Sequence, residues 1–490
     1  MAAESTFGLV IGGVESNGTN GATEELLDPS TNRPFARVAV GAVDDARHAM
    51  EVAQAAFDAG EWAGGDGAKR AKALLRLAHL LDEQQEAFAA LETRNMGKTL
   101  RESRVDVGFV VRTLEYVAGL ADKVEGATIP VPGARFNYTV REPLGVTVHI
   151  APWNYPLLLA MRSVAPALAA GNTVVLKPAS LTPLTAVRFA RLAGEAGLPN
   201  GVLNVVPGPG GRLGEALVRD PRCRSVSFTG SSEVGHRIAA LAAERLIPAT
   251  LELGGKSPVV VLPDADVERA ARGIALGIFG NAGQMCWAGS RLIVHETLRS
   301  ALLEKLRAIA EAMRLGPGTE DGVEMGPLVS REQEQRVLDY VRAARDDGGQ
   351  VVTGGAKATG PSLADGNFVR PTVVADVPPT SKAVREEIFG PVLSVFAYRE
   401  PDEAVRLANE TPFGLFAALW TRDLASAHHL ARRLEAGMVV VNEPPLTFPQ
   451  TPFGGFKESG IGTEQGLGVV ASYTRTKNVL VNVAVPKRKP

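Results

Sequence analysis

Hydrophobic and polar positions divide the chain into regions of different period. Apolar residues recur at helical spacing through residues 43–58 and 67–93, which predicts core-facing helices after an irregular N-terminal segment. From residue 146 the pattern changes to short apolar runs separated by amphipathic stretches of helical length. The runs lie at residues 146–150, 173–176, 202–206, 225–228 and 258–262. This alternation predicts a parallel sheet covered on both faces, with ligands bound at its strand ends.

A second alternating series follows between residues 264 and 441. A helix is expected over residues 267–279, and strands are expected near 291–295, 392–397 and 416–421. We therefore predict an α/β fold with two doubly wound, Rossmann-like α/β domains and a crevice between them. Residues 127–142 differ, because apolar and polar residues alternate beside prolines and a glycine, which predicts an exposed hairpin suited to assembly.

Composition and charge narrow the class of protein. The 490 residues are about three times the size of a typical domain. Hydrophobic residues make up 45% and charged residues 22%, which is typical of a globular chain. The formal net charge of -2 argues against a nucleic-acid partner. No apolar run reaches the ~18 residues that a membrane span needs. The 52 glycines predict many tight turns and close backbone approaches.

The two cysteines must be explained singly, because they cannot form a disulfide framework in a chain of this size. With no signal-peptide pattern at the N-terminus, we expect a cytoplasmic protein. Cys286 follows a predicted helix within a glycine-containing turn, a position suited to reaction, although a small buried apolar role is the alternative. Cys223, which lies between two arginines before a strand, is expected to be structural.

Glu252 is a candidate general base. It interrupts an apolar run, so burial would raise its pKa towards neutrality and suit it to activating water. The alternative is a strand-end carboxylate paired with Lys256. Gly254 and Gly255 favour the first interpretation, because they let another backbone or a cofactor approach closely.

Asn154 is a candidate oxyanion donor. It stands between Pro152 and Pro156, directly after the first predicted strand of the sheet, and the prolines hold its amide rigidly. Capping of the following helix is the alternative role.

Two further segments could bind a phosphate or a ribose. Residues 228–235 run from a strand through Gly230 and Ser231 into a helix start, where backbone amides could hold a pyrophosphate. Their spacing matches neither the common dinucleotide fingerprint nor a Walker loop. Lys177 ends a predicted strand and could meet a ribose or phosphate, with a surface lysine as the alternative.

In their order and spacing these residues resemble the aldehyde dehydrogenase superfamily across nearly the whole chain. The most specific motifs are residues 152–156, 176–178, 228–235, 251–256, 283–286, 387–391 and 452–460. The resemblance implies an NAD(P)-dependent oxidoreductase without a metal. It implies the hydrolytic type rather than the CoA-acylating type, which typically lacks the general base that Glu252 supplies. An inert homologue is a further alternative, against which the intact set of Cys286, Glu252, Asn154 and Glu387 argues.

The resemblance also implies a mechanism. Cys286 attacks the aldehyde carbon while the Asn154 side chain and the Cys286 backbone N–H hold the oxyanion. The thiohemiacetal loses hydride to the nicotinamide, and Glu252 activates the water that hydrolyses the thioester. Glu387 is implied to hold the nicotinamide ribose, Phe389 to pack near the ring and Lys177 to hold the adenosine ribose. The remaining cofactor contacts are expected from Trp153, Ser180, Gly230, Ser231 and Gly254.

Two positions refine the expected specificity. Ser180 stands where family members that prefer NAD often carry an acidic residue, so we predict that NADP is used at least as well as NAD. Arg162 lies on the expected tunnel helix, where it could pair with a distal carboxylate of a semialdehyde or other polar aldehyde. A structural ion pair is the alternative for Arg162, and apolar aldehydes or amino-aldehydes are the alternative substrates. The other expected substrate contacts are Tyr155, Trp287, Thr447 and Phe448.

The resemblance implies a division into three parts. The NAD(P)-binding domain is expected to contain residues 1–125, 146–252 and 441–466, and the catalytic domain residues 253–440. Residues 126–145 and 467–490 are expected to form an oligomerisation element, with a strand near 478–485 that pairs with another subunit. A homodimer or homotetramer is therefore expected, and a small-molecule aldehyde is the expected partner.

Overall fold

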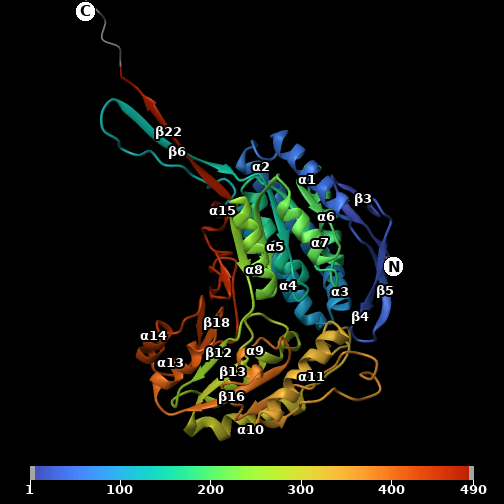
Figure 1. Cartoon of the computed structure of the whole chain (residues 1–490), viewed down its shortest axis with the longest axis vertical. Coiled ribbons are helices and arrows are strands. Elements are labelled where there is room, and N and C mark those ends of the chain that lie inside the picture. The colour runs from blue at the N-terminus through green and yellow to red at the C-terminus, as the bar shows by residue number, and fades with distance from the viewer. Residues whose placement is uncertain (1–5, 485–490) are drawn as a thin grey trace, which may run out of the picture.

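Two large sheets organise the computed structural model, which describes residues 6–484 (Figure 1). The first has eight strands in the order β21-β11-β10-β7-β8-β9-β2-β3. Their bounds are β2 (Leu9–Ile11), β3 (Val14–Ser16), β7 (Val146–Ile150), β8 (Thr173–Lys177), β9 (Leu203–Val205), β10 (Cys223–Thr229), β11 (Ala249–Glu252) and β21 (Gly460–Ile461). Strands β7 to β11 are parallel, and the chain winds outward from β7 in both directions. The first doubly wound sheet is thus confirmed.

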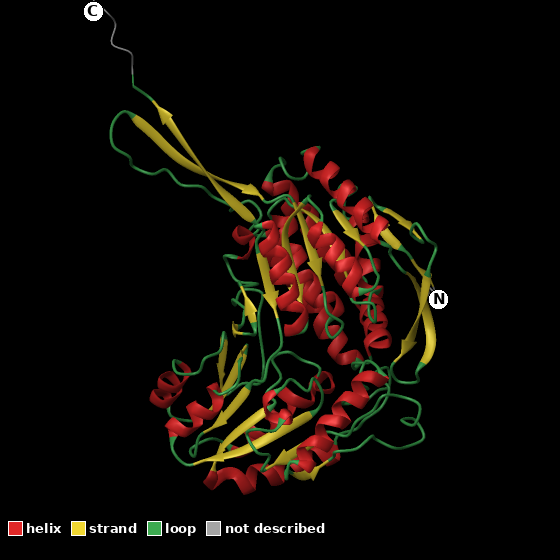
Figure 2. Cartoon of the chain, viewed as in Figure 1, coloured by secondary structure: helices red, strands yellow, loops and turns green. Residues whose placement is uncertain are grey.

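The second sheet has seven strands in the order β14-β15-β16-β13-β12-β18-β19. Their bounds are β12 (Pro258–Val261), β13 (Arg291–His295), β14 (Gln350–Thr353), β15 (Thr372–Ala375), β16 (Val392–Tyr398), β18 (Phe416–Trp420) and β19 (Met438–Val441). All neighbours pair in parallel except β14 with β15. Figure 2 shows the two sheets in separate halves of the molecule, as the sequence predicts.

Helices cover both faces of the first sheet. On β8, Val174 and Leu176 pack under α2, α4, α5 and α6, whereas Val175 packs under α1, α7 and α8. These helices are α1 (Val43–Asp58), α2 (Gly67–Glu83), α4 (Leu100–Ala118), α5 (Pro156–Ala169), α6 (Leu184–Glu195), α7 (Gly210–Arg219) and α8 (Ser232–Arg245). Successive residues of β8 point to opposite faces of the sheet. Because helices cover both faces, the apolar run of β8 is unbroken.

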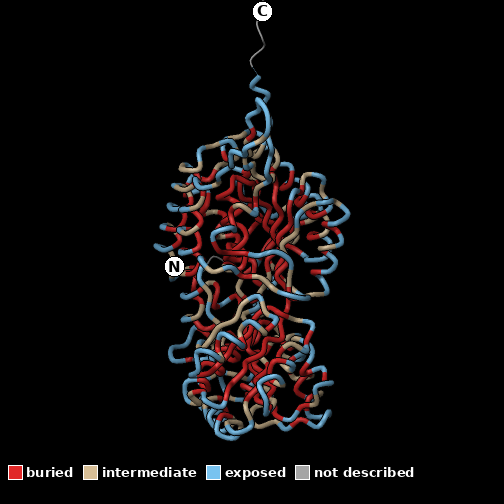
Figure 3. The backbone as a smooth tube through the Cα atoms, turned by 90° about the vertical axis from the view of Figure 1, so that its left-hand side faces the viewer, coloured by how far each residue is buried: buried red, intermediate tan, exposed pale blue. Residues whose placement is uncertain are grey.

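Helices of the second half similarly surround its sheet. They are α9 (Val267–Phe279), α10 (Glu296–Ala312), α11 (Arg331–Asp346), α12 (Lys382–Arg385), α13 (Pro401–Asn409) and α14 (Leu424–Ala431). Buried residues concentrate in each half around its own sheet (Figure 3). The segment expected as one helix over 67–93 is two, α2 and α3 (Gln85–Met96), because the backbone leaves helical geometry at Gln84.

Residues 6–39 are more regular than the sequence suggests. Strands β1 (Thr6–Phe7), β5 (Arg33–Ala39) and β4 (Thr23–Asp28) form a three-stranded sheet, and β2 and β3 extend the first large sheet. The expected irregular start is therefore wrong. These strands are short or half-exposed, so their apolar pattern is weak.

A two-stranded ribbon projects from the first half (Figure 1). It pairs β6 (Arg135–Pro143) with β22 (Thr474–Asn482) in antiparallel fashion. The hairpin expected within residues 127–142 is confirmed in part: the segment before β6 folds back on it through an antiparallel bridge from Thr128 to Tyr138 and hydrogen bonds at Ala127 and Ile129, but the long strand partner of β6 is β22. The expected terminal strand begins earlier than predicted, and its end at residue 485 lies outside the described residues. Within residues 6–484, no helix has the length and apolar character that crossing a bilayer requires.

Candidate active site

Cys286 lies in the wall of a cavity of about 400 Å³ between the two halves. Helices α4, α5 and α9 and the loop around residues 445–447 form the remaining walls. Four of the five expected substrate residues line it, namely Tyr155, Arg162, Trp287 and Thr447. Phe448 does not line the cavity. Phe448 is 51% exposed, and its backbone N–H and carbonyl both bond to the Thr451 hydroxyl.

Close backbone packing fixes the loop that carries Cys286. A Cβ on Gly255 would collide with the Cys286 carbonyl oxygen, and a Cβ on Gly283 would collide with the backbone of Gly390. Gly283 also has a φ of +73°, which L side chains rarely adopt. These two glycines therefore hold the cysteine loop between the first residues after β11 and the segment before β16.

The Asn154 side chain is tied to the same loop. Asn154 is buried beyond the carboxyl end of β7, and its Nδ2 donates a hydrogen bond of 2.9 Å to the carbonyl of Gln284. Gln284 stands two residues before Cys286. Because a primary amide has two N–H groups, this bond uses only one of those of Asn154.

Glu252 ends β11 with its carboxylate in the protein interior. The residue is 2% exposed, and neither carboxylate oxygen has a hydrogen-bond partner among residues 6–484. Burial raises the pKa of Glu252 well above its ordinary value; nearby Arg162 lowers it and Glu464 raises it further. Lys256, the alternative partner weighed from the sequence, donates instead to the Ala383 carbonyl at 2.8 Å.

Arg162 has a different partner from the expected substrate carboxylate. Its Nε donates to Oε2 of Glu464, and both side chains are almost completely buried. The guanidinium also lies 4.4 Å from the ring centre of Phe453. The alternative of a structural ion pair is thus the one observed, although Nη2 has no partner among the described residues. Arg162 also lies near enough to Glu252 and Cys286 to favour the charged form of each.

Burial of the Cys286 thiol favours its protonated form. Burial raises its pKa to about 12, against the lowering effect of Arg162, and the negative charges of Glu387 and Glu252 raise it too. Cys223 is buried in the core against β10 and β7, as its structural interpretation requires. The two thiols therefore lie in different environments, since only Cys286 lines the cavity.

The expected cofactor residues of the first half gather at the carboxyl edge of its sheet. Lys177 ends β8, and burial lowers its pKa to about 8. Ser180 donates to the Gly208 carbonyl at 2.8 Å. Gly230 follows β10, and Ser231 caps α8 by accepting from the Val234 N–H. This is the edge where doubly wound sheets bind nucleotides.

The remaining expected cofactor residues meet across the crevice. Glu387 Oε1 accepts a hydrogen bond of 3.0 Å from the Gly255 N–H, and its carboxylate packs against Gly254. Burial raises the pKa of Glu387 to about 7. The rings of Phe389 and Trp153 contact edge-to-face with centres 5.1 Å apart. Residues of the two halves thus meet at the Trp153–Phe389 contact, and Glu387 bonds to Gly255, which packs against the Cys286 carbonyl.

Sequence reasoning missed Glu464. It is 1% exposed, and besides Arg162 it accepts a hydrogen bond of 3.2 Å from Ser227 Oγ. Its only signal in the sequence is a carboxylate placed between Gly462 and Gly466, just after the glycine-rich motif at residues 452–460. That signal does not reveal a partner that lies 302 residues away.

Fold and site together define an α/β protein with a cysteine-bearing cavity beside a nucleotide-type sheet edge. The chain matches the model of the aldehyde dehydrogenase family over residues 16–479. It is 44% identical to hydroxyisobutyraldehyde dehydrogenase of Mycolicibacterium austroafricanum, over 95% of this chain and 91% of that protein. It is 43% identical to phenylacetaldehyde dehydrogenase of Pseudomonas fluorescens, over 96% of this chain and 95% of that protein.

Solved structures of aldehyde dehydrogenases also resemble this chain. An aldehyde dehydrogenase from Bacillus cereus in complex with NAD+ superposes with a TM-score of 0.96 at 40% identity, covering 98% of this chain and 97% of that one. Betaine aldehyde dehydrogenase from Staphylococcus aureus, also in complex with NAD+, gives 0.96 at 36% identity, covering 97% and 94%. This chain belongs to the aldehyde dehydrogenase family, and it is an oxidoreductase that acts on aldehydes.

Proposed function

We propose that this enzyme oxidises an aldehyde to a carboxylic acid through a thioester on Cys286, with NADP or NAD as the cofactor. The observation that carries the proposal is the shared environment of three side chains. Cys286 faces the cavity, the Asn154 amide is bonded to the cysteine loop, and Glu252 holds a buried carboxylate without a partner among the described residues. Nucleophile, oxyanion donor and base are the three groups that acyl chemistry on a thiol requires.

The first step adds the Cys286 sulfur to the aldehyde carbon. Burial raises the thiol pKa, so the thiol loses its proton to solvent as the sulfur attacks, and the Glu252 carboxylate, a strengthened base because it too is buried, is kept for the later water step. The aldehyde oxygen gains negative charge as the carbon–sulfur bond forms. The second N–H of Asn154 and the Cys286 backbone N–H stabilise that charge.

A nicotinamide cofactor, when bound by these residues, would supply a hydride acceptor, and loss of hydride from the Cys286 adduct leaves a thioester on the cysteine. Glu252 then takes a proton from the attacking water, which adds to the thioester carbon, and Cys286 leaves as the thiolate. Glu252 passes this proton to the Cys286 thiolate, and release of the acid then leaves both groups in their starting state. Hydrolysis rather than transfer to CoA follows from the buried base.

We propose the following roles for the expected residues of the dinucleotide site. Lys177 and Ser180 would hold the adenosine ribose, Gly230 and Ser231 the pyrophosphate, and Glu387 the nicotinamide ribose. Three residues remain, at the inner end of the crevice. Gly254 lies beside Glu387, and Trp153 lies beside Phe389. Two relatives with solved structures contain NAD+, which supports a nicotinamide dinucleotide here.

We propose that the enzyme uses NADP because Ser180 has a neutral hydroxyl near Lys177, which presents no negative charge to a 2′-phosphate. The ratio of kcat/KM values with NADP and NAD tests this. We expect a ratio of at least one, and a hundredfold preference for NAD would contradict it.

For the substrate, we propose an aldehyde with an apolar or aromatic tail. The cavity is walled largely by apolar side chains, among them Phe109, Leu158, Trp287 and Phe453, and Glu464 already neutralises Arg162. The relative named for phenylacetaldehyde supports an aromatic tail, the relative named for betaine aldehyde supports a cationic tail rather than a carboxylate, and the relative named for hydroxyisobutyraldehyde supports a small polar tail. The partnerless Nη2 of Arg162 favours the second candidate, a polar aldehyde such as a semialdehyde.

Comparing kcat/KM across hexanal, benzaldehyde, betaine aldehyde, glycolaldehyde and succinic semialdehyde separates the two candidates. The apolar proposal expects hexanal and benzaldehyde to rank first. A first rank for succinic semialdehyde would support the polar candidate. Absence of cofactor reduction with every aldehyde would contradict the proposed activity itself.

We also propose the three-part division inferred from the sequence, with residues 126–145 and 467–490 as the oligomerisation element. The projecting ribbon of β6 and β22 exposes apolar side chains such as Phe136 and Leu480, which supports contact with another subunit. Light scattering of the purified chain is expected to give the mass of a dimer or tetramer, and a monomer would contradict the assignment.

A further inference from the structure

One carboxylate joins the start of α4 to the loop that carries Cys286. Glu102 closes a capping box at the N-terminus of α4, where its Oε2 accepts hydrogen bonds from Thr99 N at 2.9 Å and from Thr99 Oγ1 at 2.7 Å. Its other oxygen, Oε1, accepts a hydrogen bond of 2.7 Å from the Asn281 backbone N–H. The capping box is an ordinary local device, but the bond to Asn281 spans 179 residues.

The backbone that Glu102 contacts has an unfavourable conformation. Asn281 has φ 47° and ψ 32°, and Ala282 has φ 51° and ψ 34°. Two successive left-handed residues without glycine are strained, and alanine has no side-chain polar group that compensates. Such a turn persists only where its surroundings hold it, and the bond to Glu102 meets it at its first residue.

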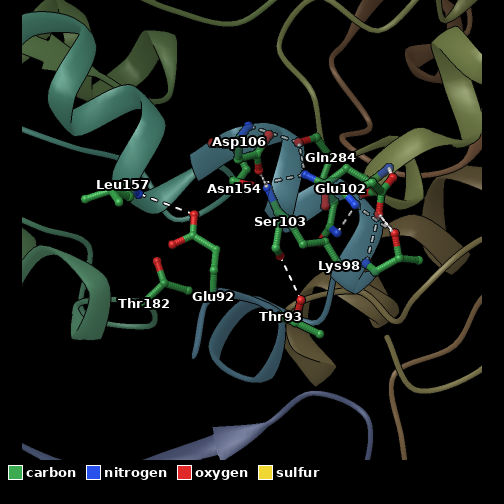
Figure 4. A network of polar contacts seen from close by, with 12 residues as sticks. Glu92, Thr93, Lys98, Glu102, Ser103, Asp106, Asn154, Leu157, Thr182 and Gln284 are labelled. Atoms are coloured by element: carbon green, nitrogen blue, oxygen red, sulfur yellow. Dashed lines mark hydrogen bonds and ion pairs between the residues drawn. The ribbon is translucent and has the colours of Figure 1, made fainter. Parts of the chain in front are cut away.

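The strained turn leads directly into the candidate catalytic groups. Asn281 Nδ2 donates to the carbonyl of Asn154 at 3.1 Å and to the carbonyl of Gln284 at 3.2 Å. Gln284 Nε2 returns a bond of 2.9 Å to the Asn281 carbonyl, and Asn154 Nδ2 donates to the Gln284 carbonyl. Figure 4 shows Glu102, Asn154 and Gln284 in this network. The position of Asn281 therefore sets both the oxyanion donor and the cysteine loop.

The start of α4 is itself anchored in the interior. Lys98 forms a buried ion pair with Asp106, and its Nζ lies 3.7 Å from the ring centre of Tyr155. Figure 4 places Lys98 and Asp106 next to Glu102. Since this end of α4 is held on both sides, the Glu102 carboxylate is a rigid support rather than a mobile surface group.

We propose that Glu102 is a positioning residue, which acts through its hydrogen bond to Asn281 to hold the Asn154 amide and Cys286 in their reactive arrangement. The inference rests on the proposed function of those two residues. It predicts an effect on the chemical step that differs from the effect of losing a helix cap.

Glu102→Ala and Thr99→Ala form a matched pair. Both disrupt the capping box, Thr99→Ala by removing the Thr99 hydroxyl bonds, but only Glu102→Ala removes the bond to Asn281. We expect Glu102→Ala to lower kcat about 10- to 100-fold, because small misplacements of reacting groups are costly, while the cofactor KM changes less than about threefold. Thr99→Ala is expected to lower the melting temperature similarly but to keep kcat within about twofold of wild type. Glu102→Gln keeps an acceptor for Asn281 and is expected to restore most of kcat.

Alkylation of Cys286 by iodoacetamide gives a readout that does not depend on turnover. Its rate should fall in Glu102→Ala and not in Thr99→Ala. Equal kcat losses in the two alanine variants, or equal losses in the Ala and Gln variants, would overturn the proposal. If Glu102→Ala does not fold, Glu102→Asp replaces it, since the shorter side chain cannot bridge both partners, and wild-type kcat in that variant would overturn the proposal. Activity that survives in Cys286→Ala would instead refute the proposed function.

Discussion

Arg162 and Glu464 form a buried ion pair in the wall of the cavity that contains Cys286. Arg162 stands on α5, eight residues after Asn154, and its charge favours the ionised forms of both Cys286 and Glu252. The pair is thus part of the electrostatics of the reacting groups as well as of the fold.

Removing Arg162 should affect both reactivity and stability. In Arg162→Met the Cys286 pKa rises further, so the alkylation rate at pH 8 should fall and its pH profile should move to higher pH. The Glu464 charge is left buried, which costs about 3–5 kcal/mol. Urea unfolding should show that loss, and Glu464→Gln in the same chain should recover part of it. An unchanged alkylation profile would show that Arg162 does not act on the thiol.

The two cysteines provide matched variants. Cys286→Ala should abolish aldehyde oxidation while leaving cofactor binding measurable by intrinsic tryptophan fluorescence. Cys223→Ala should retain wild-type kcat and lose only about 1 kcal/mol, since it removes one buried sulfur from the core. Loss of activity in the Cys223 variant together with normal folding would contradict the assignment of Cys286 as the only reactive thiol in the site.

Glu252 should make stability depend on pH. Its folded pKa lies well above the ordinary 4.5, so the protonated form is favoured by folding. That contribution is fully present below pH 4.5 and is lost as the pH rises through the folded pKa. Glu252→Gln cannot ionise and should therefore have a higher melting temperature than wild type at pH 8, with a smaller difference at pH 5. A lower melting temperature at pH 8 would contradict the burial of an unpaired carboxylate.

Cofactor choice should respond to charge at position 180. In Ser180→Glu the new carboxylate would repel a 2′-phosphate, so kcat/KM with NADP should fall at least about 100-fold while the value with NAD changes far less. Ser180→Ala removes only the bond to Gly208 and serves as the control. Equal losses with both cofactors in the Glu variant would place Ser180 away from the 2′ position.

The parts of the fold that the sequence predicts are those with strong local periodicity. Strands β7 and β13 and helices α1 and α9 have the predicted bounds. The ribbon could not be predicted, because Val140 pairs with Lys477 and no local pattern encodes a partner so distant. The residues of the site likewise divide into those with a local sequence signal and those without one. The glycine turns and strand ends locate Cys286, Glu252 and Asn154, whereas the Glu464 partner of Arg162 and the Glu102 bond to Asn281 depend on tertiary packing.

The most direct test of the central claim is the mass of the enzyme during turnover. Glu252→Gln should still form the thioester but hydrolyse it slowly, giving a burst of reduced cofactor. Acid quenching of that variant after mixing with benzaldehyde and NADP, followed by mass spectrometry, should reveal a benzoyl adduct on the peptide containing Cys286. A burst without any adduct, or an adduct on another residue, would contradict covalent catalysis by Cys286.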